Sequence, residues 1–172
     1  MEIEITEDML IEARQNVKKY NTFNLFCGDY AQKLAGEVGR LALRKYLIGA
    51  SIPFVEDTRI GNKDEFDFKI KDKNVSLKTQ LVNYLPEERW RCEVNEKQLN
   101  NPCDFHLFAK TNLSKNKVWL VGIISKDRFD NKGILRKEGE IMEDNFKKWA
   151  IKETKKDVSI LELDPINAFS HL

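Results

Sequence analysis

The chain has 172 residues, a length that suits one domain with a hydrophobic core of ordinary size. Hydrophobic residues make up 41% of it and charged residues 33%, which indicates a folded domain with a heavily solvated surface and excludes a disordered polypeptide. Because the formal net charge is only +1, any surface for nucleic acid must be a local gathering of basic residues.

The cysteines and the first residues bear on the cellular environment. Cys27, Cys92 and Cys103 lie far apart and form no C-x-x-C pair, which indicates reduced thiols and disfavours a zinc centre. The first residues are acidic and lack the basic and apolar regions of a signal peptide. No apolar run is long enough to span a bilayer. We therefore expect a cytoplasmic protein with no membrane association.

Two helices are predicted near the start of the chain. The first covers residues 6–19, because Thr6 precedes two acidic residues and apolar residues then recur at helical spacing. The second covers residues 29–47, with Asp29 as its cap and one apolar stripe along its length. Glu37 falls beside that stripe, in a row of charged residues.

An edge strand and a strand pair are predicted next. Residues 52–60 indicate an irregular or edge strand, because Pro53 cannot donate a ladder hydrogen bond. Residues 64–71 and 74–80 each alternate apolar and polar side chains, which is the pattern of half-buried strands. The polar break between them suits a turn, so we expect a hairpin that places Asp67 on one face with a polar row of the second strand. This polar row consists of Ser76, Lys78 and Gln80.

Further strands and short helices are predicted in the rest of the chain. Residues 84–90 would form a loop, since Pro86 pushes the residue before it out of helical geometry. The other expected elements are a short helix near residues 95–100, strands over 103–109 and 118–124, a helix over 143–151 and a strand over 158–163. No Gly/Pro/Ser linker precedes the last part, so residues 125–172 are expected to pack on the same core.

This order of elements, with an acid and a lysine on paired strands, resembles the PD-(D/E)XK nuclease superfamily. The residues that carry the resemblance are Glu37 on the helix, Asp67 on one strand, and Ser76, Leu77 and Lys78 on the next. It covers about residues 28–124 and implies a single α/β domain with a mixed central sheet flanked by helices, built on a restriction-endonuclease-like αβββαβ core. The helix at 6–19 would precede this core, and residues 125–172 would form a C-terminal α/β extension.

The resemblance also implies an ion and a set of roles. A Mg²⁺ or Mn²⁺ ion would take oxygen ligands from Asp67, Glu37, the backbone carbonyl of Leu77 and, through a bound water, Ser76. Lys78 would orient the attacking water or stabilise charge on the phosphoryl group, with Gln80 beside it as a further catalytic residue. The expected activity is hydrolysis of DNA phosphodiester bonds by a metal-dependent endonuclease of the restriction, repair or junction-resolving kind.

One position departs from the family pattern. Ser76 stands where the motif has an acid, as in the family branches that carry a neutral polar residue there. The change leaves fewer negative charges for a metal ion, and Glu65 or Glu93 are alternatives for the missing carboxylate. A second interpretation is a catalytically inactive module of the same fold that binds nucleic acid or a protein partner. A third is an unrelated α/β domain.

DNA is the expected partner, held by basic and aromatic side chains near the site. The candidates are Arg40, Arg44, Lys69, Trp90 and Arg91. Glu37 has an alternative role, because Arg40 lies three residues further along the helix and can form an ion pair with it. His106 is expected to be a hydrogen-bonded strand residue. Cleavage of both strands of a duplex would favour a symmetric pair of sites, so a homodimer is a candidate assembly.

Overall fold

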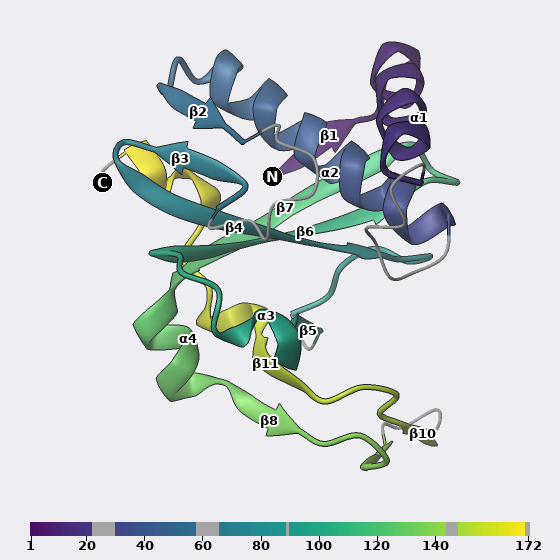
Figure 1. Ribbon diagram of the computed structural model, residues 1–172, viewed down its shortest axis with the longest axis vertical. Helices are drawn as coiled ribbons and strands as arrows, with labels where there is room; N and C mark the ends of the chain where they lie inside the picture. The colour runs from purple at the N-terminus through teal and green to yellow at the C-terminus, as the bar shows by residue number, and fades with distance from the viewer. Residues whose placement is uncertain (22–29, 58–65, 89, 144–147, 171–172) are drawn as a thin grey trace.

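The computed structural model describes residues 1–21, 30–57, 66–88, 90–143 and 148–170, and its centre is a six-stranded mixed sheet with elements packed on both faces (Figure 1). The helices are α1 (Glu7–Asn21), α2 (Tyr30–Gly49), α3 (Glu96–Leu99) and α4 (Lys126–Lys132). The strands are β1 (Glu2–Glu4), β2 (Phe54–Glu56), β3 (Phe68–Ile70), β4 (Lys73–Leu81), β5 (Arg91–Asn95), β6 (Phe105–Asn112), β7 (Lys117–Ser125), β8 (Ile134–Arg136), β9 (Ile141–Glu143), β10 (Lys148–Ala150) and β11 (Lys155–Ser159). Two short 3-10 helices follow, Ile160–Glu162 and Ile166–Ser170.

The central sheet has the strand order β1-β7-β6-β4-β3-β2. Strands β2, β3 and β4 form an antiparallel meander, β4 runs parallel to β6, and β6 is antiparallel to β7. Two parallel neighbours need a crossover connection, and this one contains β5 and α3. Strand β4 therefore has β3 as its neighbour on one side and β6 on the other.

Helices α1 and α2 cover one face of the sheet, above the strands in Figure 1. Leu34 and Val38 of the predicted apolar stripe on α2 pack in the same core as Val75 of β4. The helix approaches β4 very closely at Gly39, where a Cβ atom would lie 2.4 Å from Thr79 Oγ1. A glycine at this position allows α2 to rest directly on β4.

A second core lies on the opposite face, where Figure 1 shows α3, α4, β5, β8 and β11 below the central strands. Its buried residues are Cys92, Val94, Phe108, Ile124, Phe129 and Val158. Strands β5, β11 and β8 form a small antiparallel sheet in this layer. Alternate residues of β6 face different cores, since Leu107 and Ala109 belong to the α2 side and Phe108 to the other.

The predictions for the first two helices and for the central sheet are confirmed. Helices α1 and α2 match the helices expected at 6–19 and 29–47, although the expected cap Asp29 lies outside the described residues. Strands β3 and β4 form the expected hairpin, and β6 and β7 are the two later strands. The edge strand expected at 52–60 is confirmed at Phe54–Glu56, and residues 58–60 lie outside the described ones. The fold is thus α/β with a mixed sheet flanked by helices. No helix in the described ranges is long and apolar enough to cross a membrane.

The helix predicted for residues 143–151 is wrong. In its described part the chain forms the antiparallel pair of β9 and β10, with Trp149 opposite Met142 and Ala150 opposite Ile141. The apolar residues of this segment gain cross-strand partners from the residues just before it. Such pairing outweighs a weak helical spacing, because local preference is a small term compared with packing between strands.

Two strand predictions are too long. The strand expected at 158–163 ends at Ser159, whose side chain accepts a hydrogen bond from the Leu161 amide and begins a 3-10 turn. The strand expected at 64–71 is reduced to Phe68–Ile70, and Asp64 and Glu65 lie outside the described residues. No local pattern predicted the short strands β1, β5 and β8, which pair with neighbours distant in the chain. Helix α4 was also not predicted, although its cap is local, since Ser125 Oγ accepts a hydrogen bond from the Arg128 amide.

Candidate active site beside strand β4

Asp67 lies directly before β3, where the pairing of β3 with β4 ends at Phe68 and Val75. Beyond this point the ladder no longer supplies a partner for the Leu77 amide, which instead donates to Asp67 Oδ2 at 2.6 Å. Ser76 Oγ donates to the same oxygen at 3.4 Å. The carboxylate thus replaces a strand carbonyl and is held against β4 where the two strands separate.

Side chains of β4 alternate between the two layers. Those on the α2 side are Val75, Leu77 and Thr79, which meet the core or Gly39. The polar row of Ser76, Lys78 and Gln80 therefore faces the opposite layer. Its neighbours on the parallel strand β6 are His106, Phe108 and Lys110.

Asp67 lies within electrostatic range of two cations from different elements. Burial raises the pKa of Asp67, whereas Lys78, the hydrogen bonds from Leu77 and Ser76, and the charge of Arg40 each lower this pKa. The net direction is upward, so the carboxyl group is harder to ionise than one in water. A perturbed carboxyl group beside a lysine on a polar strand face is a feature that functional sites share.

Glu37 is buried on α2, and its Oε2 accepts three hydrogen bonds. Arg40 donates two of them, from Nη2 at 2.8 Å and from Nε at 3.1 Å, and Asn16 Nδ2 donates the third at 3.2 Å. The ion pair between Glu37 and Arg40, which the sequence offered as an alternative role, is confirmed. Within the described part of the chain, Glu37 Oε1 has no hydrogen-bond partner. The metal role of Glu37 stays a prediction.

The pair between Glu37 and Arg40 belongs to a larger α2 ion network. Its members are Glu12 of α1, Glu37, Arg40 and Arg44 of α2, and Glu56 of β2. Arg40 pairs with Glu56 as well as Glu37, and Arg44 Nε lies 2.8 Å from Glu56 Oε2. Both arginines proposed for DNA therefore have carboxylate partners within the fold, and their role toward DNA stays a prediction.

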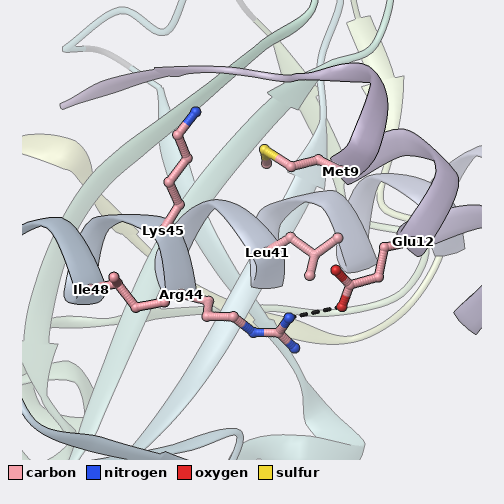
Figure 2. A pocket seen from close by; sticks show the side chains of 6 residues that line it. All are labelled: Met9, Glu12, Leu41, Arg44, Lys45 and Ile48. Atoms are coloured by element: carbon pink, nitrogen blue, oxygen red, sulfur yellow. Dashed lines mark hydrogen bonds and ion pairs between the residues drawn. The ribbon is translucent and has the colours of Figure 1, made fainter.

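Figure 2 shows Arg44 reaching Glu12 at the edge of a shallow cavity of about 240 Å³ between α1 and α2. The remaining lining residues are Met9, Leu41, Lys45 and Ile48. This volume is below the roughly 300 Å³ of small ligand pockets, and the ion pair occupies its charged end. This cavity therefore does not suit a small-molecule ligand.

Trp90 and Arg91, the aromatic and basic candidates after the hairpin, also have partners within the fold. Arg91 is the first residue of β5, directly after the loop expected at 84–90, and its Nε donates to Asp157 Oδ1 at 2.6 Å. The ring of Trp90 lies 5.2 Å from Lys110 Nζ, a cation–π contact. Contacts of these two residues with DNA stay predictions.

Two of the remaining site candidates are engaged elsewhere, and one lies outside the description. Lys69 Nζ is 3.9 Å from Asp72 in the hairpin turn. Glu93, an alternative for the missing acid of the motif, pairs with Lys155 at 2.7 Å across the small sheet. Glu65, the other alternative, falls outside the described residues.

His106 is a buried strand residue, as expected. Its ring meets Phe129 edge-on at 4.9 Å between centroids, and its Nδ1 lies 3.7 Å from Cys103 Sγ. Burial, helped by the nearby charges of Lys78 and Lys126, lowers the pKa of His106 to about 3. The imidazole is therefore neutral at physiological pH, which does not suit a general acid.

Lys110 of β6 is a buried cation that the sequence analysis did not single out. It is 2% exposed and contacts Gln80 of the polar row. The available signal was weak, because Lys110 directly follows the strand expected at 103–109 and β6 continues to Asn112. Its significance depends on the parallel register that puts Lys110 opposite Gln80, and residues distant in sequence determine that register.

The oxygens around Asp67 fit a hard divalent ion. No cluster of three or more His, Cys, Asp or Glu side chains able to hold a metal occurs among the described residues, but the expected site needs only two carboxylates. Asp67 Oδ1 has no hydrogen-bond partner in the described ranges. The carbonyl of Leu77 points to the same edge of β4 as its amide, which donates to Asp67. Carboxylate and carbonyl oxygens are the ligands that Mg²⁺ and Mn²⁺ prefer.

Comparisons with protein-family models, with curated proteins and with solved structures found no match for this chain.

Proposed function

We propose that this chain is a metal-dependent endonuclease that hydrolyses DNA phosphodiester bonds. The observation that carries the proposal is the Asp67 carboxylate, which the Leu77 amide holds beside β4 within electrostatic range of Lys78. An acid for the ion and a lysine for the phosphoryl group, on adjacent strands, suit metal-assisted hydrolysis. The order α2, β2, β3, β4, α3, β6, with β5 inserted before α3 and β4 parallel to β6, also supports the proposal, since apart from that insertion it follows the αβββαβ order of nucleases that the sequence resembles.

Mg²⁺ or Mn²⁺ would be held by Asp67, the Leu77 carbonyl and Glu37, with Ser76 contacting a bound water. When bound, the ion would polarise a phosphoryl oxygen and lower the pKa of the attacking water. Because Ser76 carries no charge, Asp67 and Glu37 are the two carboxylates of this set. We therefore expect weaker ion binding than in a site with three acids.

The residues of the chain divide the other tasks. Ser76 and Leu77 hold Asp67 through Oδ2, which keeps Oδ1 for the ion. Arg40 fixes Glu37 in the same way through Oε2. Lys78 brings the positive charge that would stabilise the phosphoryl oxygens as negative charge develops on them.

A cleavage assay with matched variants tests the proposal. Supercoiled plasmid, linear duplex and branched DNA would be incubated with Mg²⁺ or Mn²⁺, and with a chelator as the negative control. Asp67→Asn and Lys78→Met should each slow cleavage by at least about 100-fold. Asp72→Asn, a change of the same kind on the exposed hairpin turn, should cleave like the wild type. Equal cleavage by the wild type and Asp67→Asn would contradict the proposal.

A catalytically inactive binding module is the second candidate. Two observations favour it: Ser76 replaces the acid of the motif, and Arg40 already neutralises Glu37. A wild-type protein that binds DNA but cleaves none of the substrates with either ion would establish this alternative in place of the nuclease.

A further inference from the structure

Lys110 is a buried cation that contacts neutral groups in the described part of the chain. Its Nζ donates to Gln80 Oε1 and, at 3.1 Å, to the carbonyl of Arg91, and it lies 5.2 Å from the ring centroid of Trp90. In the described part of the chain no carboxylate forms an ion pair with it. Burying an ammonium group without a carboxylate is costly, so this position needs a reason beyond packing.

The contact with Lys110 fixes how the Gln80 amide is turned. An ammonium group has three donors and no acceptor, so only the amide oxygen of Gln80 can face it. The Gln80 NH₂ group is therefore turned away from Lys110. It lies on a half-exposed side chain in the same polar row as Lys78.

We infer that Lys110 is a positioning residue for a second phosphate site: it holds the Gln80 amide so that the NH₂ group donates to the DNA phosphate next to the one at Lys78. This inference rests on the proposed function. Lys78 and Gln80 are two residues apart on one strand face, a separation of about 7 Å. Neutral side-chain amides commonly contact phosphates and fix the register of a bound nucleic acid.

The charge of Lys110 also acts on the phosphate through Gln80. A hydrogen bond polarises the amide that accepts it, and a polarised amide is a stronger donor at its NH₂ end. The buried cation would thus strengthen a neutral contact without reaching the DNA. The Arg91 carbonyl and the Trp90 ring contact the ammonium group. Burial lowers the pKa of Lys110, and the nearby Cys92 and Glu93 act against this.

Equilibrium binding separates this role from a purely structural one. Binding of a fluorescent DNA duplex would be measured without divalent ions for the wild type, Lys110→Met, Gln80→Ala and the double variant. Each single change should weaken binding by about three- to tenfold. The double variant should bind like Gln80→Ala alone, because Lys110 acts through Gln80.

Two further variants serve as controls. Lys115→Met, at an exposed lysine in the turn after β6, removes the same charge and should leave affinity within about twofold of the wild type. Gln80→Glu keeps the contact with Lys110 but replaces the NH₂ donor by an oxygen, so it should weaken binding even if Lys110→Met fails to fold. An additive loss in the double variant, unchanged binding by Gln80→Glu, or no DNA binding by the wild type would overturn the inference.

The outcome is distinguishable from that of the proposed function. A protein that binds DNA with the expected coupling but never cleaves it would contradict the nuclease and keep the phosphate site. A protein that cleaves DNA, but whose affinity for DNA is unchanged by substitutions at Lys110 and Gln80, would support the nuclease and contradict the phosphate site.

Discussion

The two sides of β4 handle buried charge in different ways. On the α2 side, carboxylates and guanidinium groups pair with one another in the α2 ion network of Glu12, Glu37, Arg40, Arg44 and Glu56. On the other side, the buried Lys110 contacts an amide, a carbonyl and an indole ring. Paired charges cancel and fix the docking of α2. Burial lowers the pKa of Lys110, and no carboxylate among the described residues forms an ion pair with it. We therefore assign a structural role to the ion pairs of the α2 ion network, with the second oxygen of Glu37 still proposed for the ion, and a role toward DNA to Lys110.

Asp67 lies between these two regions. Arg40 from the α2 side and Lys78 from the polar row both lower its pKa, yet burial raises it further. Neither region thus neutralises this carboxylate fully, which is what a site for a divalent ion requires.

The largest effect on stability is expected when the α2 ion network is broken. Arg40→Met would leave Glu37 without a cation and Glu56 with Arg44 alone, so the free energy of unfolding should fall by about 3 kcal/mol. Urea denaturation measures this change. Arg14→Met removes an exposed pair with Glu7 and should cost less than about 0.5 kcal/mol. If Arg40→Met were as stable as the wild type, the α2 ion network would not stabilise the fold as proposed.

A smaller effect is expected where α2 touches β4. In Gly39→Ala the new Cβ would lie 2.4 Å from Thr79 Oγ1, and the overpacking should cost about 1–3 kcal/mol in unfolding free energy. Gly36→Ala is the matched control, because no atom lies within 4 Å of its added Cβ and alanine favours the helix by about 1 kcal/mol. Adding Thr79→Ala to Gly39→Ala removes the two closest contacts and should restore part of the loss. Equal stabilities of the two alanine variants would show that α2 is not seated on β4 at Gly39.

The sequence predicts the hairpin side of this site well and the rest of it poorly. Alternation along residues 74–80 was enough to put Asp67 and the polar row on paired strands, because a period of two belongs to each strand by itself. The pair between Glu37 and Arg40 was also readable, since residues three apart on a helix are neighbours.

Other features depend on contacts that no local pattern contains. Glu56 joins the α2 ion network only because an edge strand passes beside α2, and Lys110 meets Gln80 only through the parallel register of β4 and β6. The pair of β9 and β10 replaced a predicted helix for the same reason. Strand register is set by the whole sheet, so side chains that meet across it are not readable from spacing.

The smallest expected effect on stability is at Asp67, where substitution should increase the stability instead of lowering it. Because burial raises the pKa of Asp67 above 3.8, the folded state holds the proton more tightly than the unfolded state. The contribution of this group is most favourable below pH 3.8 and is lost as the pH rises through the folded pKa. The amide introduced by Asp67→Asn cannot ionise, so we expect this variant to gain stability relative to the wild type as the pH is raised from acid to neutral.

Denaturation curves across this pH range measure the gain, and added ion sharpens the test. Mg²⁺ that binds at Asp67 favours the ionised carboxylate and stabilises the folded wild type by mass action, whereas Asp67→Asn removes one of the two proposed carboxylate ligands and should bind the ion more weakly. At neutral pH the stability advantage of Asp67→Asn over the wild type should therefore shrink or reverse as Mg²⁺ is added. If the difference in unfolding free energy between the two proteins changes with neither pH nor Mg²⁺, Asp67 belongs with the paired charges of the α2 ion network. The two sides of β4 would then not differ in the way proposed.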